Sequence, residues 1–178
     1  MRESLKIALG GMIAALSVVI MLITYLSPFL VYTAPPFAGL LLICVLEEID
    51  RKWAFGVYVA ISLLSLFLIA DKEAAVFYTM FFGYYPVLRS ALEKKLKKKL
   101  PVFFIGLLVF NLSAAGAIAV CAFVFHVDYS EFSEYGRILT ALFILLMNLC
   151  FFFYDVLLRK LKQLYLIKIQ PRLRKLFR

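Results

Sequence analysis

Long apolar runs separated by short polar breaks constrain this chain more than any other feature of its sequence. A helix needs about 20 mostly apolar residues to cross the hydrocarbon core of a bilayer. Hydrophobic residues make up 65% of the chain, whereas soluble domains contain roughly 45–50%. A water-soluble fold of 178 residues cannot bury this much apolar surface. The sequence therefore predicts an integral membrane protein.

Six runs are apolar enough to be predicted as membrane-spanning helices, although two of them are short. Ser27 and Pro28 separate the first two runs, because proline lacks a backbone N–H and restricts the residue before it. The predicted spans cover residues 5–26, 30–46, 53–70, 74–88, 101–125 and 138–158. We therefore expect an all-α membrane protein whose six transmembrane helices form one bundle within residues 1–160.

The basic residues predict how the bundle is oriented. Cytoplasmic loops of membrane proteins are enriched in Lys and Arg. Alternate breaks between the runs, together with the two ends of the chain, contain every Lys and Arg except Lys72 and Arg137. This alternation predicts that both termini lie in the cytoplasm. We expect a multi-pass protein of the plasma membrane, of bacterial origin.

Two basic segments are predicted to lie along the cytoplasmic membrane surface. In the run LEKKLKKKL, residues 92–100, leucines recur every four residues and give a short helix one apolar face. The tail, residues 161–178, also mixes apolar and basic residues. Both segments fit interfacial helices that bind anionic lipids; the alternative is a solvated loop and a frayed tail. The lysines of the run are Lys94, Lys95, Lys97, Lys98 and Lys99. Because the basic residues adjoin apolar spans, no nucleic-acid partner is expected.

Catalytic and metal-binding motifs are not apparent in the sequence. His126 is the only histidine and has no companion His or Cys cluster, which makes a metal site or a catalytic triad a poor interpretation. No GxxxxGK[ST] phosphate-binding motif occurs either. We predict that the chain is not an enzyme and carries no cofactor, and that any ATPase is a separate subunit.

Several polar residues lie inside the apolar runs and need partners there. Asn111 and Asn148 fall near the middle of the last two spans. Hydrocarbon offers them no hydrogen bonds, so they bond to each other, to a neighbouring helix or to a ligand. Asp155 stands one turn before Arg159, a spacing that favours an ion pair. Any of these residues could be either structural or functional.

Acidic residues and tyrosines near the ends of the spans can likewise be interpreted as structural or as functional. Glu47 and Glu48 close the second span and are expected to pair with Arg51, Lys52 or the lysine run. The seven-residue spacing of two tyrosines in the fourth span places them on one helix face. That face either lines a polar pocket or serves packing. These tyrosines are Tyr78 and Tyr85.

Prolines and small residues mark two further segments. Residues 27–39, SPFLVYTAPPFAG, predict either irregular backbone covering a pocket or a tight turn with interfacial aromatic residues. In the first span, Gly10 and Ala14 are four residues apart, as are Gly11 and Ala15. Such faces allow another helix to approach closely, whether it belongs to this bundle or to a partner.

Two stretches of the sequence are similar to a known family. They read KIALGGMIAALSVVI and LEEIDRKWAFGVYVAISLLSLFLIADKEAAVFYTMFFGYYPVLRSALEKK. Together with six spans in about 180 residues, they resemble the substrate-binding (S) component of energy-coupling factor transporters, of a type whose substrate is unassigned. The resemblance covers roughly residues 5–100, and the last two spans resemble the family only in topology.

The resemblance implies a partner surface and a ligand site. In that family, an AxxxA face on the first helix docks on a transmembrane T component, and here Gly11 and Ala15, or Gly10 and Ala14, occupy its place. A T component and a pair of ABC ATPases drive uptake of a vitamin or metal ion, which binds on the outer side. The ligand-binding residues implied here are Tyr32, Thr33, Pro35, Tyr78 and Asn111.

Two functions remain open at this point. The first is a membrane-embedded subunit that binds a small, vitamin-like molecule for an uptake transporter. The second is a membrane scaffold or regulatory subunit without a ligand. The second interpretation is favoured by the absence of any substrate signature and by the concentration of positive charge on the predicted cytoplasmic side.

Overall fold

A computed structural model of the chain describes residues 3–27, 29–96, 98–126 and 136–171, with only the backbone described at 136–139 and 169. The described part is helical almost throughout and contains no strand. Its α-helices are α1 (Glu3–Leu22), α2 (Leu30–Glu48), α3 (Arg51–Leu68), α4 (Lys72–Phe77), α5 (Tyr85–Lys95), α6 (Lys99–Val124) and α8 (Gly136–Leu164). Three short helical elements are also present: the 3-10 turn η1 (Ile23–Leu26) and the π segments η2 (Tyr78–Phe82) and η3 (Tyr165–Ile169).

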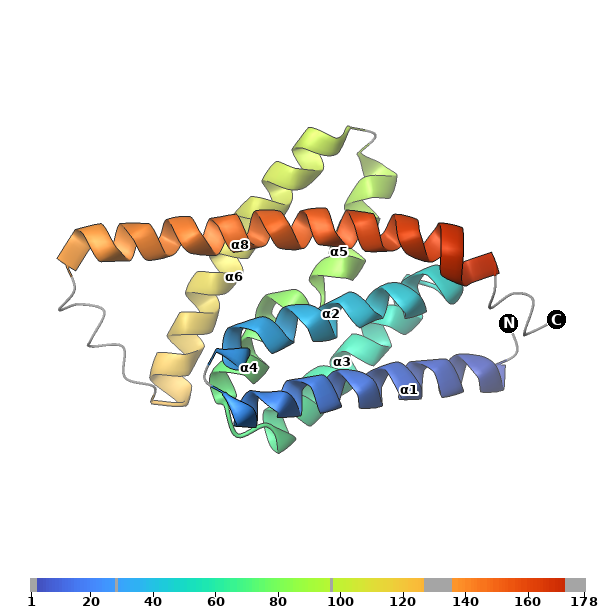
Figure 1. Cartoon of the computed structure of the whole chain (residues 1–178), viewed down its shortest axis with the longest axis horizontal. Helices are drawn as coiled ribbons and strands as arrows, with labels where there is room; N and C mark the ends of the chain where they lie inside the picture. Colours follow the sequence, from blue (N-terminus) through green and yellow to red (C-terminus); the bar gives the residue numbers. More distant parts are fainter. Residues whose placement is uncertain (1–2, 28, 97, 127–135, 172–178) are drawn as a thin grey trace.

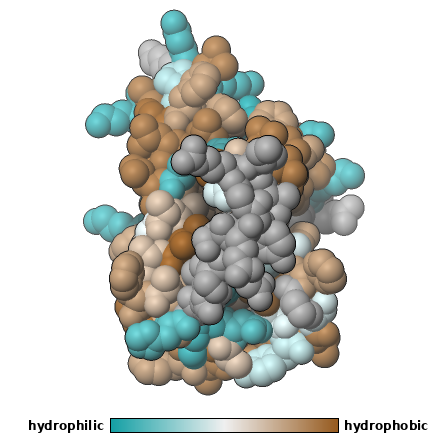
Figure 2. Space-filling model, turned by 90° about the vertical axis from the view of Figure 1, so that its left-hand side faces the viewer, coloured by the Kyte–Doolittle hydropathy of each residue, from teal (hydrophilic) through white to brown (hydrophobic). Residues whose placement is uncertain are grey.

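Five of the described helices are long and apolar enough to cross a membrane. They cover Glu3–Leu26, Leu30–Glu48, Arg51–Leu68, Lys99–Val124 and Thr140–Lys168. Large apolar side chains also lie on the surface: Phe29, Phe67 and Phe123 are 84%, 83% and 83% exposed. Figure 2 shows hydrophobic residues over much of the coloured surface. Helices of this length and surface composition are compatible with a multi-pass membrane protein.

The fourth predicted span, residues 74–88, differs from the single helix expected there. It is divided into α4, the π segment η2 and α5. Gly83 N–H donates to the Tyr78 carbonyl at 2.8 Å, which widens the turn by one residue. Pro86 has no N–H to give to the Phe82 carbonyl four residues earlier. The hydroxyl of Tyr154 on α8 donates to that carbonyl instead, at 3.2 Å.

The helices pack around α2, which lies between α1 and α8 in Figure 1. The first three, α1, α2 and α3, contact one another, and α8 lies against the other side of α2. The α6 helix crosses α8 and diverges from α1, α2 and α3 (Figure 1). The start of α1, the α2–α3 turn and the end of α8 lie at the right-hand end of Figure 1. The ends of α1, α3 and α6 lie toward the left.

The lysine run does not form the short separate helix that its leucine spacing predicted. The α5 helix ends at Lys95 and α6 begins at Lys99, with Leu96 extended at φ −111° and ψ 110°. Leu92 therefore belongs to α5 and Leu100 to α6. Lys97 lies outside the described residues.

The C-terminal segment continues the last long helix. The α8 helix runs past residue 160 to Leu164 and leads directly into η3. The Tyr165 hydroxyl donates to Glu48 of α2 at 3.1 Å, so this part of the predicted tail packs on the bundle. Residues 172–178 lie outside the described residues.

A glycine allows the broken segment to approach α2 closely. Gly39 is buried on α2. A Cβ atom added there would overlap the Phe82 carbonyl oxygen and lie 2.8 Å from the Tyr154 hydroxyl oxygen. The absence of a side chain at Gly39 therefore leaves room for the hydrogen bond between Tyr154 and Phe82.

Replacing this glycine is expected to destabilise the fold. Gly39→Ala forces α2 away from η2 and lowers the free energy of unfolding by about 1–3 kcal/mol, as overpacking does elsewhere. Gly56→Ala is the matched control, because a Cβ at Gly56 meets no atom within 4 Å. Thermal unfolding in mild detergent compares the two variants. Equal midpoints would show that the close approach at Gly39 is unimportant.

Candidate functional site

A cavity of about 350 Å³ lies between α2, α4, α6 and α8, and we call it the α6–α8 cavity. Ligand pockets occupy roughly 300–1,000 Å³ and combine apolar walls with a few polar groups. The cavity matches that description, because aromatic and aliphatic side chains surround a small polar centre. It is lined by Tyr32, Phe77, Phe110, Asn111, Ala114, Ala115, Ile118, Thr140, Phe143, Ile144, Met147 and Asn148.

The polar centre of the cavity is a pair of asparagines. Asn111 Nδ2 donates to Asn148 Oδ1 at 2.8 Å, and Asn148 Nδ2 donates to Asn111 Oδ1 at 3.3 Å. Each amide also donates to the carbonyl four residues earlier, that of Leu107 or Ile144, at 2.9 and 2.8 Å. The structure thus confirms one of the predicted alternatives, that the two residues bond to each other. All four amide N–H groups are used, but each Oδ1 retains acceptor capacity.

Tyr32 forms one wall of this cavity. Its hydroxyl donates to Glu73 Oε2 at 2.9 Å, and its ring packs edge-on against Phe77 with the centroids 5.8 Å apart. Tyr32 also lines a second cavity of about 280 Å³, together with Thr33 and Pro36. Phe77, Phe110, Met147 and Tyr32 line both spaces, so the two cavities adjoin.

The structure brings only some of the predicted ligand-binding residues together. Tyr32 and Asn111 line the α6–α8 cavity, and Thr33 lines its neighbour. Tyr78 is fully buried beside Tyr58, with 6.3 Å between ring centroids, and its hydroxyl has no partner among the described residues. Pro35 is also fully buried. Neither Tyr78 nor Pro35 lines either cavity.

Sequence reasoning did not identify the apolar side of the cavity. This side consists of residue types that usually face lipid or pack in a core, namely Phe77, Met147, Ala114 and Ala115. A signal for this side is present in the sequence as the small-residue stretch Ala114–Ala115–Gly116, which interrupts a long apolar span. Small side chains leave space between helices, but they do not reveal which helices enclose that space.

The two small-residue pairs of α1 face in different directions. Gly10 is buried, and a Cβ there would lie 3.1 Å from Val57 Cγ2 of α3. Ala14 packs against the same core. Gly11 and Ala15 are exposed, and a Cβ at Gly11 would meet nothing within 4 Å. Gly10 and Ala14 therefore serve packing within the bundle, whereas Gly11 and Ala15 lie on its surface.

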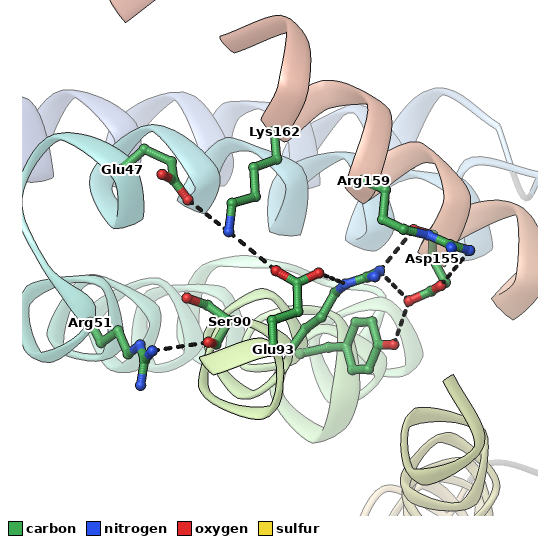
Figure 3. A network of polar contacts seen from close by, with 9 residues as sticks. Glu47, Arg51, Ser90, Glu93, Asp155, Arg159 and Lys162 are labelled. Carbon is green, nitrogen blue, oxygen red and sulfur yellow. Dashed lines mark hydrogen bonds and ion pairs between the residues drawn. The ribbon is translucent and has the colours of Figure 1, made fainter. Parts of the chain in front are cut away.

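A second cluster, which we call the polar network, joins α2, α5 and α8 (Figure 3). Asp155 is fully buried at its centre. One carboxylate oxygen contacts Arg89 Nη1 and accepts a hydrogen bond from the Tyr85 hydroxyl at 2.7 Å. The other oxygen is 3.1 Å from Arg159 Nη2. This confirms the predicted pair of Asp155 with Arg159 and adds an arginine from α5.

The polar network extends from Arg89 to α2. Arg89 Nε contacts Glu93 Oε1 at 3.1 Å, and Lys162 Nζ lies 3.2 Å from Glu93 and 3.3 Å from Glu47 (Figure 3). Lys162 on α8 therefore links α2 to α5. Among the described residues, Glu47 and Glu48 pair with neither Arg51 nor Lys52 as predicted, because Lys162 and Tyr165 of the last helical segment contact them instead. Arg51 instead donates to the Ser90 carbonyl at 2.9 Å.

The described residues contain no group of three or more His, Cys, Asp or Glu side chains placed to hold a metal ion. His126 is exposed at the end of α6, with φ at 53°. Comparisons of the chain with protein-family models, with curated proteins and with solved structures found no match. The resemblance to S components therefore stays a prediction from the sequence.

Breaking the polar network at its centre is expected to destabilise the protein. Asp155→Ala removes the buried carboxylate that the guanidinium groups of Arg89 and Arg159 share, and the loss of one partner of a buried ion pair typically costs about 3–5 kcal/mol. Arg89→Met combined with Asp155→Leu removes both charges, so a smaller loss is expected. Lys162→Met is a milder control, because the lysine side chain is 33% exposed. Unfolding titrations in mixed detergent measure the losses, and an Asp155→Ala loss no larger than that of Lys162→Met would contradict this view.

Proposed function

We propose that this chain is the membrane-embedded substrate-binding subunit of a small-molecule uptake transporter, powered by partner ATPase subunits. The observation that supports this most strongly is the α6–α8 cavity. It has the volume of a ligand pocket and contains a pair of side-chain amides in a mostly apolar wall. The sequence resemblance to S components adds a second and independent argument.

We further propose a six-span topology with both termini in the cytoplasm. In this view, the broken segment from Lys72 to Lys95 serves as the fourth crossing. In support of this topology, the start of α1, the α2–α3 turn and the end of α8 lie at the same end of the molecule in Figure 1, and they carry basic residues such as Lys6, Arg51 and Lys162. The cavity residue Tyr32 then lies near the outer side, where a ligand enters.

The cavity wall suggests the chemistry of the ligand. Phe77, Phe110 and Phe143 offer aromatic faces, which favour a flat and largely apolar molecule. The asparagine pair has acceptor capacity left on its carbonyl oxygens, so the ligand would supply hydrogen-bond donors. A heterocyclic, vitamin-like molecule with N–H or O–H groups combines both properties.

Energy would come from partner proteins. The sequence contains no phosphate-binding GxxxxGK[ST] motif. Gly11 and Ala15 give α1 an exposed small-residue face, and such faces permit close helix contacts in membranes. We propose that this face docks on a T component, which is in turn bound to a pair of ABC ATPases.

A second candidate function is a scaffold or regulatory subunit that binds no small molecule. The hydrogen bonding of Asn111 and Asn148 favours it, since each amide already satisfies the other. In that case the asparagine pair only holds α6 to α8. The two experiments below distinguish these functions.

Filling the cavity tests ligand binding. Ala115→Phe places a ring in the α6–α8 cavity, whereas Ala119→Phe adds the same ring one turn further along α6, at an exposed position outside it. Each protein is purified from native membranes, and the small molecules retained are identified by mass spectrometry. A molecule retained by wild type and Ala119→Phe is expected to be lost from Ala115→Phe. Identical molecules in all three preparations, or none in the wild type, would favour the scaffold.

Enlarging the exposed face of α1 tests partner docking. Gly11→Leu with Ala15→Leu is expected to abolish association with membrane and ATPase partners, while the protein stays folded because both positions are exposed. Gly56→Leu with Ala60→Leu is the matched control, since these exposed α3 residues have the same spacing. Affinity purification with mass spectrometry measures association. Unchanged association of the Gly11/Ala15 variant would rule out this surface.

A further inference from the structure

A cavity of about 310 Å³ lies between α5, α6 and α8, beside the polar network, and we call it the basic cavity. Among the described residues, five cationic side chains line it and Glu93 is its only carboxylate. The cations come from α5, α8 and the start of α6. The packing of these helices, and not closeness in the sequence, therefore brings them together. They are Arg89, Lys98, Lys99, Arg159 and Lys162.

The positive charge in the basic cavity is only partly compensated. Arg89 and Arg159 share Asp155, whereas Glu93 is shared by Arg89 and Lys162, and Lys162 also contacts Glu47. Lys98 and Lys99 have no ion pair within the part of the chain that the structure describes. Cations concentrated in a crevice repel one another and attract an anion.

The start of α6, where Lys98, Lys99 and Val102 line the same cavity, also carries backbone hydrogen-bond donors. The helix begins at Lys99, and its N-cap residue Lys98 makes no side-chain capping bond. The first N–H groups of a helix have no partner within the helix, and the positive end of its dipole favours an anion there. Pro101 lacks an N–H, which leaves Lys99 and Leu100 as backbone donors in this turn.

We propose that the basic cavity binds the phosphate of an anionic glycerophospholipid. Lys98, Lys99 and the start of α6 contact the phosphate, and Arg159 and Lys162 contribute positive charge from α8. The apolar side chains of Leu96, Val102 and Leu166 line the same space and suit the first carbons of an acyl chain. This apolar wall favours a lipid over a free phosphate. The inference does not depend on the proposed uptake function.

The test compares two pairs of lysines from the same run. The full chain is purified, stripped of lipid in detergent, titrated with phosphatidylglycerol and followed by native mass spectrometry. Lys98→Gln with Lys99→Gln is expected to weaken binding about tenfold. Lys94→Gln with Lys95→Gln removes the same charge at the end of α5, outside the cavity, and is expected to bind as wild type does.

A third variant separates shape from charge. Gln163 is exposed and lines the cavity, so Gln163→Trp obstructs it without changing its charge and is expected to weaken binding to a similar degree. Equal losses in the two lysine variants would indicate diffuse attraction and overturn the proposal, as would wild-type affinity in Gln163→Trp. Displacement of the lipid by equimolar glycerol phosphate would show a free-phosphate site and overturn the lipid assignment.

Discussion

Buried backbone polar groups need hydrogen-bond partners, and this requirement governs the packing around the break between α4 and α5. The break between α4 and α5 releases the Phe82 carbonyl, because Pro86 cannot donate to it. In an apolar environment an unpaired carbonyl is costly. Tyr154 of α8 supplies the missing donor, and Gly39 of α2 leaves room for it. One irregular turn therefore fixes where α2, α5 and α8 meet.

The buried charge in the polar network also has partners from more than one helix. Asp155 is fully buried, yet it contacts two guanidinium groups and a tyrosine hydroxyl. A buried carboxylate is tolerated only with such partners. Because Arg89 comes from α5 and Lys162 reaches α2, the polar network fixes three helices relative to one another.

Local features were predictable from the sequence, whereas long-range ones were not. Apolar runs located the five long helices, and the four-residue spacing identified the pair of Asp155 with Arg159. The partners of Glu47 and Glu48 depend on how α8 packs on α2, which no spacing encodes. Tyr78 and Tyr85 were expected on one helix face, but they belong to different core clusters. The π segment and the turn between them change the rotation per residue, so the seven-residue rule does not apply.

The position of the α6–α8 cavity depends on the points at which α6 and α8 are held in place. The asparagine pair joins the two helices near their middle, and the polar network anchors α8 to α2 and α5 near its C-terminal end. Between the asparagine pair and the far end of α6, the facing residues include Ala114 and Ala115, which are too small to fill the space. Larger residues there would close the gap by ordinary packing. The α6–α8 cavity thus results from small side chains placed beyond a fixed crossing point of the two helices.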